Sequence, residues 1–134
     1  MTSFPLKIVT PDGLIYDGQA EEVVVRTTTG DIGILAGHIN CVAPLGMGRA
    51  TVIIDGRKRY AACIGGMLSV VNGQATLVPT TFEWAEDIDL PRANRSLERA
   101  QKILHDKDAS SADIKLAEAR LKRALVRKSV AQMK

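Results

Sequence analysis

The sequence is poor in aromatic residues and in cysteine, and each scarcity excludes a class of protein. Aromatic side chains make up 4 % of the 134 residues and apolar residues 46 %, so a packed core must consist mainly of Val, Ile, Leu and Ala. Two cysteines, Cys41 and Cys63, lie in apolar surroundings, and there is no CxxC motif. This pattern is typical of buried thiols in a reducing compartment, not of a disulfide framework or a zinc site.

Long apolar runs and targeting segments are also missing. No stretch approaches the roughly 20 apolar residues that a membrane-spanning helix needs. A strand-like run follows the first methionine, where a signal peptide would place a charged segment and then an apolar one. We therefore expect a soluble, cytosolic chain.

Motifs for catalysis do not occur. The two histidines, His38 in a glycine-flanked loop and His105 near the end of a helical pattern, have no nucleophile pattern beside them, and HExxH and GxSxG are absent. Residues 30–38 (GDIGILAGH) are rich in glycine but lack the GK[ST] of a phosphate-binding P-loop. No cluster of residues suggests a magnesium site. None of these motifs or residues therefore indicates catalysis.

The first segment of the chain, residues 1–84, has the pattern of short strands. Its apolar runs are rich in β-branched residues, and Asp55-Gly56 and Asn72-Gly73 separate two pairs of them. Such dipeptides between apolar runs favour β-hairpins, and many short strands with frequent turns favour an antiparallel sandwich or barrel. We assign an antiparallel β-sandwich to residues 1–84.

The second segment, residues 85–134, has a helical period, which makes the fold class α+β. Its apolar stripes are Leu90, Ala93, Leu97, Ala100 and Leu104, followed by Ile114, Ala117, Leu121 and Ala124. Asp87 or Asp89 can cap the first helix, and Ser110 or Ser111 the second. We expect an antiparallel two-helix hairpin in which the alanines allow close approach.

Positive charge is concentrated in the helical segment. Residues 85–134 carry twelve Lys/Arg against eight Asp/Glu, whereas residues 1–84 carry six against seven. Arginines three and four positions apart form a stripe on each helix: Arg92, Arg95 and Arg99, then Arg120, Arg123 and Arg127. Guanidinium groups hold phosphate or carboxylate in a fork, so an anionic ligand or acidic partner is indicated. A solvated face is the plain alternative. A nucleic-acid partner is disfavoured because aromatics for base stacking are lacking.

Four stretches resemble the epsilon subunit of bacterial F-type ATP synthases, in the order and spacing of that family. They are residues 10–38 (TPDGLIYDGQAEEVVVRTTTGDIGILAGH), 65–78 (GGMLSVVNGQATLV), 85–93 (AEDIDLPRA) and 121–134 (LKRALVRKSVAQMK). The chain departs from the family at Ala36 and Asn40, where proline is frequent, and at Trp84. Loss of the prolines is expected to loosen that loop.

The resemblance implies a subunit of the central rotor stalk of a proton-translocating ATP synthase, one that is not itself an enzyme. The sandwich would bind the gamma subunit and the ring of c subunits. The hairpin would permit turnover when folded against the sandwich, and would block ATP hydrolysis when extended to the catalytic alpha and beta subunits. The implied partner-binding residues are Asp31, His38, Arg120, Lys122 and Lys128. The chain would be peripheral at the cytoplasmic face of the bacterial membrane, attached only through the complex, with no nucleic-acid partner.

Some members of that family bind ATP in the closed hairpin through the pattern Ile/Leu-Asp-x-x-Arg-Ala, which residues 88–93 match. The resemblance implies ATP as a regulatory ligand, with no required cofactor, at Glu83, Ile88, Asp89, Arg92, Arg99, Arg123 and Arg127. The arginines would hold phosphates, the two acids would hold the nucleoside or the arginines, and the backbone of Ile88 would meet the adenine.

Three alternatives remain open. Asp89 alone is explained by a helix cap, or by an ion pair with Arg92. The helices could inhibit hydrolysis independently of ATP. A free-standing adaptor with a basic helical tail, with or without a nucleic-acid partner, is the remote alternative.

Overall fold

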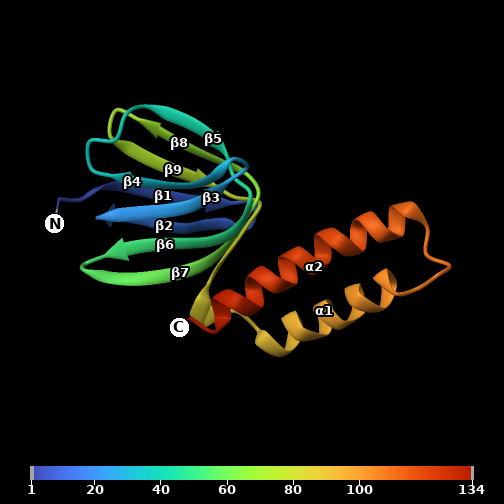
Figure 1. Ribbon diagram of the computed structural model, residues 1–134. Coiled ribbons are helices and arrows are strands. Elements are labelled where there is room, and N and C mark those ends of the chain that lie inside the picture. Colours follow the sequence, from blue (N-terminus) through green and yellow to red (C-terminus); the bar gives the residue numbers. More distant parts are fainter. Residues whose placement is uncertain (1, 134) are drawn as a thin grey trace.

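The computed structural model describes residues 2–133, in which ten strands form a sandwich and two helices follow it (Figure 1). The strands are β1 (Phe4–Thr10), β2 (Gly13–Ala20), β3 (Glu22–Thr27), β4 (Gly30–Leu35), β5 (Cys41–Pro44), β6 (Met47–Ile54), β7 (Arg57–Ile64), β8 (Met67–Val71), β9 (Gln74–Val78) and β10 (Thr81–Trp84). A short 3₁₀ turn, η1 (Ala85–Asp87), leads into α1 (Leu90–Leu104) and α2 (Ser111–Ala131). The expected fold class is confirmed.

The strands form two five-stranded sheets, in the orders β2-β1-β9-β8-β5 and β10-β7-β6-β3-β4. Every pairing between these strands is antiparallel except that of β1 with β9, which is parallel. The first sheet is therefore mixed, because β1 lies parallel to β9 on one side and antiparallel to β2 on the other.

The two predicted hairpin turns adopt the geometry that their sequences favour. Asp55 and Asn72 have φ of 52° and 50°, and Gly56 and Gly73 follow with 77° and 81°. Two successive positive φ values define the type I′ turn, whose twist matches that of the flanking strands. The hairpins β6–β7 and β8–β9 are thus set by local sequence.

The core lies between the sheets and is aliphatic, as the composition required. Its most deeply buried side chains include Leu6, Ile8, Val23, Val25, Ile34, Val52, Leu68, Val70 and Leu77. Two aromatic residues from β10 complete it, because the rings of Phe82 and Trp84 pack edge to face with centroids 5.0 Å apart. Trp84, which departs from the family pattern, is therefore a core residue.

The helices begin at two of the predicted caps. The carboxylate of Asp89 accepts from the Arg92 N–H at 3.1 Å, and the Ser110 hydroxyl accepts from the Asp113 N–H at 3.1 Å in a reciprocal capping box. Alanines line the seam between the helices, as expected: Ala93, Ala100, Ala117 and Ala124 are all at most 3 % exposed. Within residues 2–133 no helix is long and apolar enough to cross a membrane.

The hairpin contacts the sandwich through the C-terminal end of α2, while its tip points away (Figure 1). Val130 and Ala131 pack in a second apolar cluster with Ala62 of β7 and with Ala85 and Ile88 of the junction. A guanidinium N–H of Arg49 donates to the Met133 sulfur at 3.4 Å. These contacts hold the hairpin in a closed arrangement.

Candidate functional site

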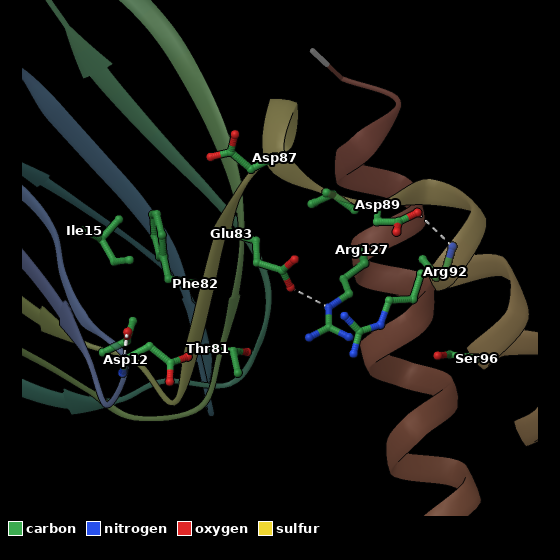
Figure 2. A pocket seen from close by; sticks show the side chains of 13 residues that line it. Asp12, Ile15, Thr81, Phe82, Glu83, Asp87, Asp89, Arg92, Ser96 and Arg127 are labelled. Carbon is green, nitrogen blue, oxygen red and sulfur yellow. Dashed lines mark hydrogen bonds and ion pairs between the residues drawn. The ribbon is translucent and has the colours of Figure 1, made fainter.

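Two adjoining cavities lie beside the hairpin, one near its junction with the sandwich and one between its two helices. The first, of about 340 Å³, lies between β10, the β1–β2 turn and the start of α1; the second, of about 550 Å³, lies between α1 and α2. Both are lined by Ser96 and Arg127, so the two spaces meet there. Figure 2 shows the first cavity, with the side chains of Arg92 and Arg127 directed into the same space.

All seven predicted ATP-binding residues line these cavities. Glu83, Ile88, Asp89 and Arg92 line the first, Arg99 and Arg123 line the second, and Arg127 lines both. They come from β10, the junction and the two helices, and the packing of the helices brings them together. Arg95, the remaining arginine of the α1 stripe, lines neither cavity.

Glu83 is paired with an arginine of the second helix. Its Oε1 lies 2.7 Å from Nε of Arg127, and the two side chains are 34 % and 31 % exposed (Figure 2). Two roles were predicted for Glu83, and in this contact it holds an arginine. The pair joins β10 to α2 across the mouth of the first cavity.

Asp89 serves as the cap of α1, which was the plain alternative for this residue. Its Oδ1 accepts from the backbone N–H of Arg92, and no ion pair joins the two side chains in the part of the chain that the structure describes. The cap fixes the start of α1. Ile88 is buried in the second apolar cluster, and its N–H donates to the Ala85 carbonyl at 3.4 Å.

The cavities differ in charge. The lining of the first includes four acids, Asp12, Glu83, Asp87 and Asp89, together with Arg92 and Arg127. The lining of the second includes four arginines and no acid. An elongated ligand with amino or hydroxyl donors at one end and several negative charges at the other would match this polarity.

Sequence reasoning missed several residues of this site. Asp12 reaches the first cavity from the β1–β2 turn, more than 70 positions before the helices, and no local pattern could place it there. Ser96 was within reach, because it lies one helical turn after Arg92 on the same face. Arg120 was assigned to protein partners, but it lines the second cavity.

The residues predicted to bind partners lie apart from one another. Asp31, at one end of β4, pairs with Arg26 at 2.7 Å, whereas His38 follows the other end of β4 and its Nδ1 lies 2.7 Å from the Ile39 carbonyl. Lys122 is exposed and Lys128 is half-buried on α2. The structure therefore does not unite Asp31 and His38 in one site.

The loop between β4 and β5 is held by a contact that the sequence did not suggest. The side-chain oxygen of Asn40 accepts from the Asn72 N–H of the β8–β9 turn at 2.8 Å. This bond restrains the loop at one of the two positions where the family often has proline. That the missing prolines loosen this loop stays a prediction, and the hydrogen bond between Asn40 and Asn72 acts against it.

Neither the cysteines nor the acids form a metal site or a disulfide within residues 2–133. Cys41 and Cys63 are both free; Cys63 is buried as predicted, whereas Cys41 is only half-buried because it lies on the short edge strand β5. No three described His, Cys, Asp or Glu side chains come close enough to hold a metal ion. Burial raises the pKa of the Cys63 thiol from about 9 to about 12, so Cys63 is neutral and unreactive at physiological pH.

Two family models match successive parts of the chain. Residues 3–85 match the β-sandwich domain of the ATP synthase delta/epsilon chain, and residues 86–132 match its long α-helix domain. The chain belongs to the ATP synthase delta/epsilon family. Within that family it is an epsilon-type chain of the bacterial, Bacillus-like kind, a non-catalytic subunit of the ATP synthase.

Full-length relatives support the epsilon assignment. The ATP synthase epsilon chain of Bacillus cytotoxicus is 42 % identical over 134 residues, with all of both chains covered. That of Bacillus velezensis is 44 % identical over 131 residues, with 98 % of each chain covered. The family resemblance drawn from the quoted motifs is thereby confirmed, while the ATP-binding feature is not tested by it.

Solved structures agree on the fold. A chain of the Euglena gracilis mitochondrial ATP synthase superposes with a TM-score of 0.83 at 23 % identity, covering 100 % of this chain and 83 % of the other. A chain of the Tetrahymena thermophila mitochondrial ATP synthase central stalk and c-ring gives 0.65 at 11 % identity, with 95 % of each covered. At these identities the likeness concerns the arrangement of sandwich and helices.

Proposed function

We propose that this epsilon chain couples rotation in the central stalk of a proton-translocating ATP synthase and inhibits ATP hydrolysis through its helices, with ATP favouring the closed hairpin. The sandwich binds the gamma subunit and the c ring. The extended hairpin reaches the catalytic alpha and beta subunits. The chain is peripheral at the cytoplasmic face of the membrane and is held there by the complex.

The outer face of the first sheet supports the gamma contact. Leu14 pairs with Val9 across β2 and β1, and Met67 of β8 pairs with Val78 and with Pro44 on either side. Leu14, Val78 and Met67 are 59 %, 48 % and 43 % exposed. These apolar rows on an open sheet face are typical of a surface that another protein covers.

The single observation that carries the ATP proposal is that all seven residues predicted to bind ATP line two joined cavities. Arg92 and Arg99 come from α1, Arg123 and Arg127 from α2, and Glu83 from the sandwich. Separation of the helices would dismantle the site. A ligand that binds only the closed form stabilises it by RT ln(1 + [L]/Kd), so ATP would oppose extension.

The electrostatics of the cavities supports a polarity for the bound nucleotide. We place the phosphates among the arginines of the second cavity, where no acid repels them. Arg92 lines only the first cavity, but its side chain is directed into the same space as Arg127, which lines both (Figure 2). The nucleoside lies in the first cavity, whose acids accept from its amino and hydroxyl groups. The basic residues Lys122 and Lys128 stay on α2 for an acidic partner in the extended state.

The test is calorimetric titration of ATP into the full chain, with and without magnesium. We compare the wild type with Arg99→Gln/Arg123→Gln, which removes two cavity arginines, and with Arg95→Gln, which removes an arginine of α1 outside both cavities. Charge-assisted hydrogen bonds contribute about 1.5–3 kcal/mol, so the double variant should lose at least about tenfold in affinity. The Arg95 control should stay within about twofold.

Each part of the proposal has its own contrary outcome. No saturable binding to the wild type would remove ATP from the mechanism and leave helices that inhibit independently of it. Equal losses in both variants would indicate general charge attraction instead of a site.

The contact with gamma has its own test. Met67→Glu should weaken co-purification with gamma, whereas Gln74→Glu, which adds the same charge to β9 outside the apolar rows, should not.

A further inference from the structure

The edge strands of the two sheets are β2, β5, β10 and β4, and the first three carry a feature that opposes pairing with another chain. β2 has a bulge, because its register with β1 skips Ile15. β5 is four residues long and ends in Pro44, which has no N–H to donate. β10 is equally short, and the Glu83–Arg127 ion pair ties the hairpin to it. Proteins protect sheet edges in these ways.

β4 has none of these protections. It pairs with β3 over all six of its residues, Gly30–Leu35, without a register shift, and it contains no proline or lysine. Its charged residue is Asp31, whose Oδ1 lies 2.7 Å from Nε of Arg26 on β3. A regular, weakly charged edge of this kind is a template for a further strand.

The hydrogen bonds of β3 show which backbone groups of β4 face outward. The Arg26 carbonyl accepts from the Gly46 N–H at 2.9 Å, and Gly46 leads into β6, on the side of β3 opposite to β4. Arg26 and its partner Asp31 are therefore a non-hydrogen-bonded pair of the β3–β4 ladder. Because the two kinds of pair alternate, the N–H and C=O groups of Asp31, Gly33 and Leu35 point away from β3.

These outward groups are nearly all unpaired within the part of the chain that the structure describes. The Leu35 carbonyl accepts from the His38 N–H at 3.1 Å and keeps a second lone pair, and no other hydrogen bond to a residue outside β4 uses an outward group of residues 2–133 on this strand. Gly33 is exposed and Leu35 is 54 % exposed. The edge of β4 is therefore open to a second strand.

We infer that this edge pairs antiparallel with β4 of a second copy of the chain, with Gly33 opposite Gly33. Asp31 then lies opposite Leu35, so the outward-facing residues meet one another and exchange ladder hydrogen bonds. Ile32 lies opposite Ile34, apolar beside apolar. The pairing joins two five-stranded sheets into one continuous sheet.

The charge on β4 selects this register. A register with Asp31 opposite Asp31 would bring like charges together, which destabilises a strand pair. In the inferred register the two Asp31 residues are about 14 Å apart along the strands. β4 itself spans only about 20 Å, so the contact is small and the dimer is reversible. The inference does not depend on the proposed ATP site or on the proposed place in the stalk.

The experiment is sedimentation velocity of the full chain from micromolar to submillimolar concentration, in which the wild type should shift from monomer to dimer. Gly33→Glu places two carboxylates opposite each other and should weaken association about tenfold or more. The substitution fits the fold, because Gly33 has no positive φ and an added Cβ would meet only Val24, at 3.9 Å. Gln74→Glu, which adds the same charge to the inner strand β9, should stay within about twofold of the wild type.

A charge-reversal pair tests the register. Gly33→Lys alone should associate as weakly as Gly33→Glu, and an equimolar mixture of the two should recover association, because Glu then faces Lys across the two-fold axis. Leu35→Glu keeps the glycine and places its charge opposite Asp31 of the second copy, so it should weaken association as well. Circular dichroism verifies that each variant keeps its strands.

Three results would overturn the inference. The first is a wild type that stays monomeric over the whole range; amide protection of β4 only in the assembled enzyme would then assign the edge to another subunit. The second is equal weakening by Gly33→Glu and Gln74→Glu, which would indicate general repulsion. The third is a mixture of Gly33→Glu and Gly33→Lys that fails to associate, which would exclude Gly33 opposite Gly33.

Discussion

Glu83 of β10 and Arg127 of α2, 44 positions apart, form an ion pair of 2.7 Å that ties the last strand to the last helix. Both side chains are about one-third exposed. A double-mutant cycle with Glu83→Gln and Arg127→Gln should therefore give a coupling energy of about 0.5–1 kcal/mol that falls with added salt. Denaturant unfolding of the four proteins measures it. A coupling of zero would mean that the apolar cluster under α2 docks the hairpin without this pair.

The two roles of Asp89 can be separated by the choice of replacement. Asp89→Ala removes the cap and should cost about 1 kcal/mol, whereas Asp89→Ser keeps a capping oxygen and should cost little. Thermal unfolding followed by circular dichroism measures the cap. ATP titration tests whether the Asp89 carboxylate binds the nucleoside. If it does, Asp89→Ser should bind ATP weakly despite its intact helix. Full ATP affinity in Asp89→Ser would reduce Asp89 to a cap.

Because of Cys63, the free energy of unfolding should depend on pH in the alkaline range. Its folded pKa is raised by burial to about 12, above the ordinary value of about 9. A raised folded pKa stabilises the fold fully below the unfolded pKa, and the stabilisation is lost as pH rises from about 9 through 12. Between those values the wild type should lose up to about 1.4 kcal/mol per pH unit more than Cys63→Ala. Urea unfolding at pH 7 and pH 10.5 compares them, with Cys41→Ala as control.

Arg59 covers the single tryptophan of the chain. Its guanidinium carbon lies 3.8 Å from the Trp84 ring centroid, and its Nη2 lies 2.6 Å from Glu86 Oε1. Arg59→Ala should shift Trp84 emission to longer wavelength and cost about 1 kcal/mol, through lost stacking and lost cover. Arg57→Ala, on the same strand and exposed, is the control. Unchanged emission in Arg59→Ala would mean that the sandwich alone shields the indole.

The elements that could be predicted are those that local sequence determines. Asp55-Gly56 and Asn72-Gly73 allow the positive φ of a type I′ turn, and Asp89 and Ser110 supply side-chain oxygens at helix starts, so no distant residue is needed. The parallel pairing of β1 with β9 was not predictable in this way, because it depends on how the chain crosses between sheets.

The candidate site likewise contains some residues that local sequence predicts and others that only tertiary packing brings there. Asp89 and Arg92 fall in one short motif, and the arginine stripes follow from helical spacing. The stacking of Arg59 on Trp84 and the arrival of Asp12 in the first cavity depend on tertiary packing. Arg120 was placed correctly on its helix, but which surface that face meets depends on how the two helices pack. The spacing of residues in the sequence predicts which of them share a helix face, but not which part of the protein that face contacts.

The docking of α2 through its last turns concentrates the contact between hairpin and sandwich at one end of this helix. Val130, Ala131 and Met133 hold that end against the sandwich, whereas α1 is joined to β10 by continuous backbone through η1. In the proposed extension, α2 would lose these contacts while the junction stays attached to β10. Polar substitutions at Val130 and Ala131 would therefore weaken the docking of the whole hairpin and leave every arginine of both stripes in place.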